Sequence, residues 1–175
     1  MSLAKQNFSN AAEEAINAQI NMELQASTVY LSMAAWASNA SVALPDRAPP
    51  ALERKHAKAL INYQNMRGGR VVLRALKAPK VDWVSAKEAV EESLQLEKDV
   101  NSALLKLHQI ADENNDPQLC DYVESDFLSE QVRSIKQLAD MCTQLARVGD
   151  GLGVYLWDQQ MRTGGTGAGG DVYNK

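Results

Sequence analysis

Hydrophobic residues recur every three or four positions along most of this chain, which is the spacing of one face of an α-helix. The first such segment, residues 10–37, contains no proline or glycine, and Ser9 precedes it as an N-cap. One face of this segment carries Ile16, Ile20, Glu23, Ser27, Tyr30 and Ala34. We therefore expect Glu23 to point toward the core, the alternative being a side chain at the edge of the face that reaches out to water.

A second helix is expected from about Ala51 to Arg67. Pro50 suits a first helical position, and Gly68 with Gly69 ends the segment. Glu53 and His56 are three residues apart, so their side chains lie one turn apart on a shared face.

A long connector, residues 70–84, precedes the third helix and is expected to be irregular around Pro79. Its length allows the third helix to run parallel to the second. Ser85 to Glu88 has the pattern of a capping box, and the helix is expected to continue to about Asn114. It carries Glu97 among apolar positions.

Asp116 and Pro117 predict the start of a fourth helix that runs without interruption to about Val148. Phe127 and Gln131 lie on its apolar face. Glycines at 149–153 separate it from a short fifth helix at about 154–161. Residues 1–162 then form one domain, and the glycine-rich segment 163–175 is expected to be disordered.

Composition narrows the class of protein. The net charge of -4 and the pI of about 5.2 disfavour a nucleic-acid partner. Cys120 and Cys142 form no disulfide framework, which favours a reduced, intracellular chain, and the expected location is cytoplasmic. No signal peptide and no membrane span are expected, and hence no membrane partner.

Polar residues occupy inward positions on all four long helices. They are Glu23, Glu53, His56, Glu97 and Gln131. Carboxylates with an imidazole offer mixed oxygen and nitrogen ligation that suits Fe²⁺, with Zn²⁺ or Mn²⁺ able to compete. By position, Glu53 is the natural bridge between two metals. The alternative is a set of unrelated edge charges, although burying several carboxylates without a cation is costly.

Several short motifs identify the family that this chain resembles. They are Asn21-Met22-Glu23-Leu24, Val29-Tyr30-Leu31-Ser32-Met33, Arg67-Gly68-Gly69-Arg70, Leu96-Glu97-Lys98, Asn115-Asp116-Pro117, Glu130-Gln131-Val132 and Gly151-Leu152 leading to Tyr155-Leu156. From Gln6 to Asp158 the chain resembles ferritin of the ferroxidase-active heavy-chain type of animals. The resemblance implies an all-α, ferritin-like four-helix bundle with a long crossover between helices two and three and a short C-terminal fifth helix. It also implies self-assembly into a hollow 24-subunit cage, with co-assembly with other ferritin subunits as a further possibility.

The same resemblance implies a dinuclear ferroxidase site. Glu23, Glu53 and His56 resemble the ligands of the first iron, and Glu53 with Glu97 those of the second. Gln131 lies nearby and Tyr30 is the neighbouring tyrosine. The implied substrates are Fe²⁺ and O₂, and the implied product is a stored ferric oxide.

A second acidic group is implied at the entrance of the cage. Asp121 and Glu124 resemble the acidic lining of the family's three-fold iron channels, which would also bind metal. Without the resemblance they would be interpreted as ordinary solvated charges. Cys120 beside them is either a transient iron ligand or a packing residue, and His108 is expected to be a surface or core histidine.

The chain departs from the family at two places. The segment between the first two helices is short and contains Pro45, Pro49 and Pro50, which puts the two-fold contact between subunits in doubt. Leu52, Lys55 and Lys58 stand where the family has acids that help mineral to nucleate. The alternative functions are therefore a non-catalytic or impaired ferritin subunit that serves as a structural cage component, or a helical interaction module without metal.

Overall fold

The computed structural model describes residues 2–44 and 50–162, with only the backbone described for Pro50, Ala51, Leu52 and Arg162. The expected disorder of 163–175 and most of the proline-containing segment lie outside these residues. In the described part, every regular element is helical: α1 (Asn10–Ala37), α2 (Pro50–Met66), α3 (Ala86–Glu113), α4 (Pro117–Val123), the π-helical turn η1 (Glu124–Leu128), α5 (Ser129–Val148) and α6 (Leu152–Arg162).

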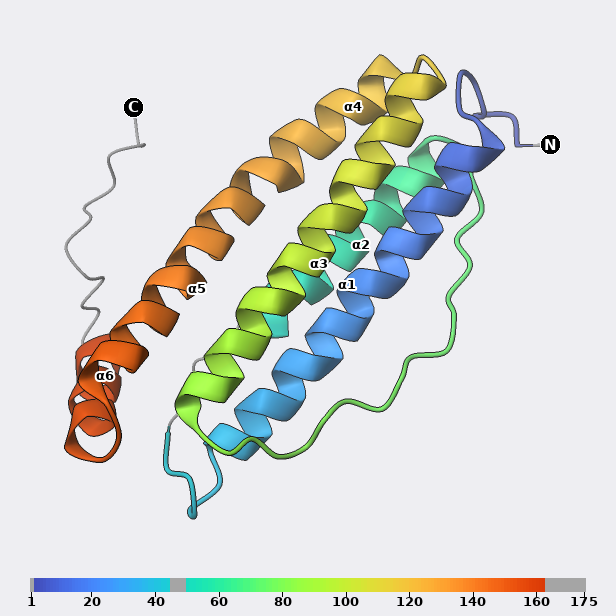
Figure 1. Cartoon of the computed structure of the whole chain (residues 1–175). Coiled ribbons are helices and arrows are strands. Elements are labelled where there is room, and N and C mark those ends of the chain that lie inside the picture. Colours follow the sequence, from blue (N-terminus) through green and yellow to red (C-terminus); the bar gives the residue numbers. More distant parts are fainter. Residues whose placement is uncertain (1, 45–49, 163–175) are drawn as a thin grey trace.

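The helices form an elongated bundle (Figure 1). α1 and α2 are antiparallel, α3 runs parallel to α2, and the succession α4, η1 and α5 returns in the opposite direction. The connector between α2 and α3, drawn in green, runs along the length of α1. The predicted long crossover and all-helical bundle are thereby confirmed.

Side-chain caps explain why three of these helices begin where they do. The Ser9 hydroxyl accepts a hydrogen bond from the Ala12 amide (3.0 Å), and the Ser85 hydroxyl accepts one from the Glu88 amide (3.1 Å). Asp116 accepts from the Leu119 amide (3.1 Å). Each cap satisfies an amide that a first helical turn leaves without a partner.

The crossover is held to α1 by side-chain amides that bind its backbone. Asn17 donates to the Arg70 carbonyl (3.0 Å) and accepts from the Val72 amide (2.9 Å). Gln25 likewise donates to the Lys77 carbonyl (3.1 Å) and accepts from the Lys77 amide (2.8 Å). An extended segment can therefore lie on a helix without pairing as a strand.

Two groups of buried side chains form the core. The larger one joins α1, α2, α3 and α4, and the smaller one packs Tyr30, Met33 and Trp83 together with Trp36. Members of the larger group include Ile16, Ile20, Leu60, Tyr63, Val100, Leu104, Leu107, Leu119, Val123 and Phe127.

The fourth helix differs from its prediction. The expected continuous helix from 117 to 148 is interrupted by the π-helical turn η1, which separates α4 from α5. A π-turn contains a wider ring of backbone hydrogen bonds than an α-helical turn, so it inserts extra chain without ending the helix.

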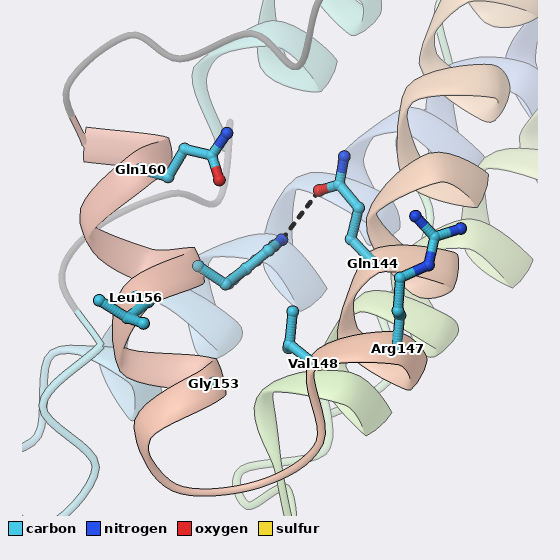
Figure 2. A pocket seen from close by; sticks show the side chains of 7 residues that line it. Gln144, Arg147, Val148, Gly153, Leu156 and Gln160 are labelled. Carbon is cyan, nitrogen blue, oxygen red and sulfur yellow. Dashed lines mark hydrogen bonds between the residues drawn. The ribbon is translucent and has the colours of Figure 1, made fainter.

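The last helix is longer than predicted and folds back beside the end of α5 (Figure 1). It begins at Leu152 rather than 154, and Gly149 and Gly151 both adopt positive φ in the turn before it. The Trp157 indole N–H donates to the Gln144 side chain (3.0 Å) beside a pocket that Arg147 also lines (Figure 2). Glycine fits the turn at Gly149 and Gly151 because positive φ is unfavourable for most other residues.

Candidate metal centre

Three carboxylates from three helices are buried inside the bundle. Glu23 of α1 is 1% exposed, Glu53 of α2 is 4% exposed and Glu97 of α3 is 5% exposed. Gln131 of α5 is buried as well, so each of the four long helical segments contributes at least one polar side chain to the interior. The helical spacing that directs neighbouring isoleucines and leucines inward also directs these polar side chains inward.

His56 lies between two of the acids. Its Nδ1 atom is 3.9 Å from Glu23 Oε2, and its Nε2 atom is 3.1 Å from Glu130 Oε2. Because Glu130 is partly exposed, the imidazole connects the buried carboxylates to a more accessible one. Sequence reasoning assigned Glu130 no role, although its position next to Gln131 was an available signal.

Two other side chains orient the carboxylates. The Gln19 amide donates to Glu23 Oε1 (2.7 Å), and the Tyr30 hydroxyl donates to Glu97 Oε1 (2.5 Å). Tyr30 was expected at this site, whereas Gln19 was not, even though it precedes Glu23 by one helical turn. Both contacts are buried and hold one carboxylate oxygen each.

Burial makes the charged forms of these acids costly. The pKa of Glu23 is raised to about 8, chiefly by desolvation and further by the nearby Glu53, Glu97 and Glu130, while the hydrogen bond from Gln19 opposes the rise. The pKa of Glu53 is raised to about 7, again chiefly by desolvation, with smaller contributions from Glu97 and Glu130 and an opposing backbone hydrogen bond. The pKa of the Tyr30 phenol is also raised, first by burial and then by Glu97. A bound cation would offset this cost.

Buried acceptor oxygens without a hydrogen-bond partner concentrate in this region. They include Glu23 Oε2, Glu53 Oε2, Gln19 Oε1 and Gln131 Oε1. Leaving such atoms unpaired costs free energy. The two amide oxygens, and the two carboxyl oxygens once ionised, can only accept a hydrogen bond or bind a cation. Oxygen-rich sites with one imidazole suit divalent metals such as Fe²⁺, so the donor set fits the predicted chemistry.

Across residues 2–44 and 50–162, no group of three or more His, Cys, Asp or Glu side chains is arranged to hold a metal ion. Gln19 and Tyr30 each hold one acid in its present orientation through a hydrogen bond.

The second acidic group is a separate cluster on the fourth helix. Glu124 Oε1 lies 2.6 Å from His108 Nε2, so His108 has an acidic partner on a neighbouring helix. Asp121 is exposed, and its carbonyl accepts a hydrogen bond from Ser125. Burial raises the pKa of the nearby Cys120 thiol, as do Asp112 and Glu124, which disfavours its thiolate.

The fold and the site together define a class: a helical bundle with a long crossover that buries carboxylates from three helices beside an imidazole. The ferritin-like domain family matches residues 13–148. The chain therefore belongs to the ferritin family, as its sequence motifs predicted.

Individual relatives agree along most of their length. The chain is 48% identical to soma ferritin of Lymnaea stagnalis over 91% of this chain and 95% of that protein. It is 44% identical to a ferritin heavy chain of Echinococcus granulosus, over 94% and 99%. It is 48% identical to a chloroplastic ferritin of Malus baccata var. xiaojinensis, over 92% of this chain and 68% of that protein.

Among the described helices, none is sufficiently long and apolar to cross a membrane.

Proposed function

We propose that this protein stores iron, oxidising Fe²⁺ with O₂ at a dinuclear site and holding the product as a ferric oxide. The observation that carries the proposal is the set of buried acceptor oxygens on Glu23, Glu53, Gln19 and Gln131 that lack a hydrogen-bond donor. Uncompensated acceptors of this kind favour a cation as their partner. Membership of the ferritin family supports iron as that cation.

The proposed roles are those that the resemblance to heavy-chain ferritins implies for these residues. Glu23 and His56 bind the first iron, Glu97 binds the second, and Glu53 bridges the two. Gln131 lies beside the second iron, and Tyr30 orients Glu97 through its hydrogen bond. Iron supplies the electrons that O₂ accepts, while the protein supplies ligand geometry and open coordination positions.

Assembly is the second part of the proposal. We propose a 24-subunit cage, open to co-assembly with other ferritin subunits and located in the cytoplasm. Asp121 and Glu124 then line a channel where copies meet, since repeated carboxylates around an axis concentrate cations. Their surface position on one chain is compatible with that role.

Replacing two ligands tests the oxidation step. In Glu53→Ala/His56→Ala, aerobic Fe²⁺ oxidation followed by absorbance is expected to fall to the rate in buffer. The loss should exceed the roughly 10–100-fold that removal of an outer partner costs at metal sites. Arg54→Ala, an exposed position between the two ligands, is the matched control and should oxidise at the wild-type rate. Size-exclusion chromatography of all three proteins shows whether assembly is retained.

Growth of the mineral core tests the effect of Leu52, Lys55 and Lys58, which stand where the family has acids. Lys55 and Lys58 are exposed on α2, and positive charge repels Fe³⁺. We expect Leu52→Glu/Lys55→Glu to accelerate mineral growth about severalfold without changing the first oxidation step. Leu52→Gln/Lys55→Gln serves as the neutral control in a light-scattering assay of core size. Equal growth in the wild type and the acidic variant would refute the idea.

A structural cage subunit with poor oxidation is the second candidate. It is favoured by the length of α2, which has 17 residues where α1 and α3 have 28, and by the location of Glu53 in its first turn. Helix ends open more readily than helix centres. Wild-type oxidation no faster than in buffer, with a cage-sized particle retained, would select this candidate.

A further inference from the structure

The π-helical turn η1 lies where the fourth helix passes from the apolar core to the metal centre. Buried residues recur at every fourth position across it: Leu119, Val123, Phe127 and Gln131. The first two belong to α4, Phe127 belongs to η1, and Gln131 belongs to α5. Local sequence contains no proline or glycine here that would explain the interruption.

A regular α-helix cannot keep these four residues on one face. At 3.6 residues per turn, each step of four residues advances about 40° beyond a full turn, so Gln131 would lie about 120° from Leu119. A π-turn accommodates one additional residue. The span then behaves like about 11 helical residues, which is close to three full turns. Both ends of the helix therefore face the bundle interior.

The turn also places two contacts on the same imidazole. The Phe127 ring meets His56 edge to face, with centroids 5.4 Å apart and an interplanar angle of 64°. Glu130, three residues later, reaches His56 Nε2 at 3.1 Å. One contact comes from inside the π-turn and the other from the first turn of α5.

Further aromatic contacts tie the α4 side of the turn to α2. Tyr122 stacks on Tyr63 with centroids 4.1 Å apart and planes 5° apart, and it meets Phe127 edge to face at 5.4 Å. His56 and Tyr63 thus belong to α2, while Tyr122 and Phe127 belong to the facing helix. These ring contacts fix the rotation of α4 and η1 relative to α2.

We infer that the π-turn is a positioning element for the metal centre: it sets the helical phase that brings Phe127 and Glu130 onto His56 and turns Gln131 inward. The contacts of Phe127 and Glu130 with His56 are present without iron. The consequence for metal ligation rests on the proposed function, so the two are tested separately.

The first test examines His56 in metal-free protein. The chain has two histidines and two phenylalanines, so ¹⁵N-histidine magic-angle-spinning NMR reports His56 beside His108, and Phe8→Leu is a matched control for Phe127→Leu. We expect Phe127→Leu to change the imidazole shifts and tautomer ratio of His56 while those of His108 stay unchanged. Phe8→Leu should leave both histidines unchanged. A wild-type His56 spectrum in Phe127→Leu would overturn the role of the ring.

The second test shortens the turn by one residue and by two. Ser125 and Asp126 are both exposed within η1. Deleting Ser125 alone leaves a span that a regular α-helix turns through nearly the same angle as the π-containing span, so this variant is the control and should keep Glu130 and Gln131 inward. Deleting Ser125 together with Asp126 should turn Glu130 and Gln131 about 100° away from the interior. We expect Co²⁺, a spectroscopic substitute for Fe²⁺, to lose its His56-dependent absorption bands in the double deletion and to keep them in the single deletion, with helicity by circular dichroism retained in both. Wild-type Co²⁺ spectra in the double deletion would overturn the inference.

If the double-deletion variant does not fold, Phe127→Leu decides whether the inference stands, because this substitution preserves chain length and apolar burial. If the wild-type protein oxidises iron no faster than buffer does, the proposed function alone is refuted, since the NMR test uses no metal. Normal oxidation in the wild type together with an unchanged His56 in Phe127→Leu would refute the inference alone.

Discussion

Metal-free protein is expected to lose stability as the pH rises from about 5 to about 8. The pKa of Glu23 is raised from 4.5 to about 8, and that of Glu53 from 4.5 to about 7. Both carboxyls therefore bind protons more tightly in the folded chain than in the unfolded chain. Their favourable contribution is complete below about 4.5 and is lost as the pH passes through the folded values. The expected decrease in unfolding free energy is of order a few kcal/mol.

Thermal or denaturant unfolding across this pH range measures the effect. Glu23→Gln removes the more strongly perturbed acid and should flatten the curve, whereas Glu91→Gln, an exposed acid paired with Lys87, should leave the curve unchanged. Stability that rises over the same range would contradict the prediction. Mn²⁺ should stabilise the protein more at high pH than at low pH, because metal ligands must be deprotonated to bind.

Loss of Arg67 is expected to have the largest effect on stability of any single substitution considered. Its guanidinium donates to both oxygens of Asp116, at 2.8 and 3.1 Å, and to the Asn7 carbonyl at 2.8 Å. It also contacts the Tyr63 hydroxyl and lies over the Phe8 ring. The N-terminal segment, the end of α2 and the start of α4 therefore meet at one cation.

Asp116 is 1% exposed, so removing Arg67 leaves a buried charge without its cationic partner, held only by the capping hydrogen bond from the Leu119 amide. We expect Arg67→Met to lower the free energy of unfolding by about 3–5 kcal/mol, measured by urea denaturation. Asp116→Asn in the same chain should restore part of this loss, because it removes the unpaired charge while an amide oxygen can still cap α4. A double mutant no more stable than Arg67→Met would show that the buried charge is not the cause.

The boundaries of the long helices were predictable because their signals are local. Ser9 and Ser85 cap α1 and α3 at the expected positions, and Pro50 begins α2. These signals depend on backbone geometry and on hydrogen bonds within a few residues. The 3–4 spacing likewise directed Glu23, Glu53 and Glu97 inward, since a helix fixes the relative direction of its own side chains. The role of these residues as iron ligands remains a prediction.

Contacts between helices could not be predicted from these local signals. The link from His56 to Glu130 joins positions 74 residues apart, and the link from Tyr30 to Glu97 joins positions 67 residues apart. Helical spacing gives the face on which each residue lies but not the rotation of one helix against another. Glu130 was missed for this reason, because it acquires its role from a side chain on another helix. Gln19 contacts Glu23 within α1, so its spacing of four residues was a local signal that went unused.

The sequence by itself determined the helical segments, the long crossover and the inward direction of the acidic side chains, all through local geometry. Tertiary packing decided the interruption of the fourth helix at Glu124–Leu128. An α-helix and a π-turn have similar backbone preferences, so the choice depends on whether Phe127 must meet His56 while Leu119 and Gln131 both face inward. Packing also decided which acids lie together, and thereby which pKa values are raised.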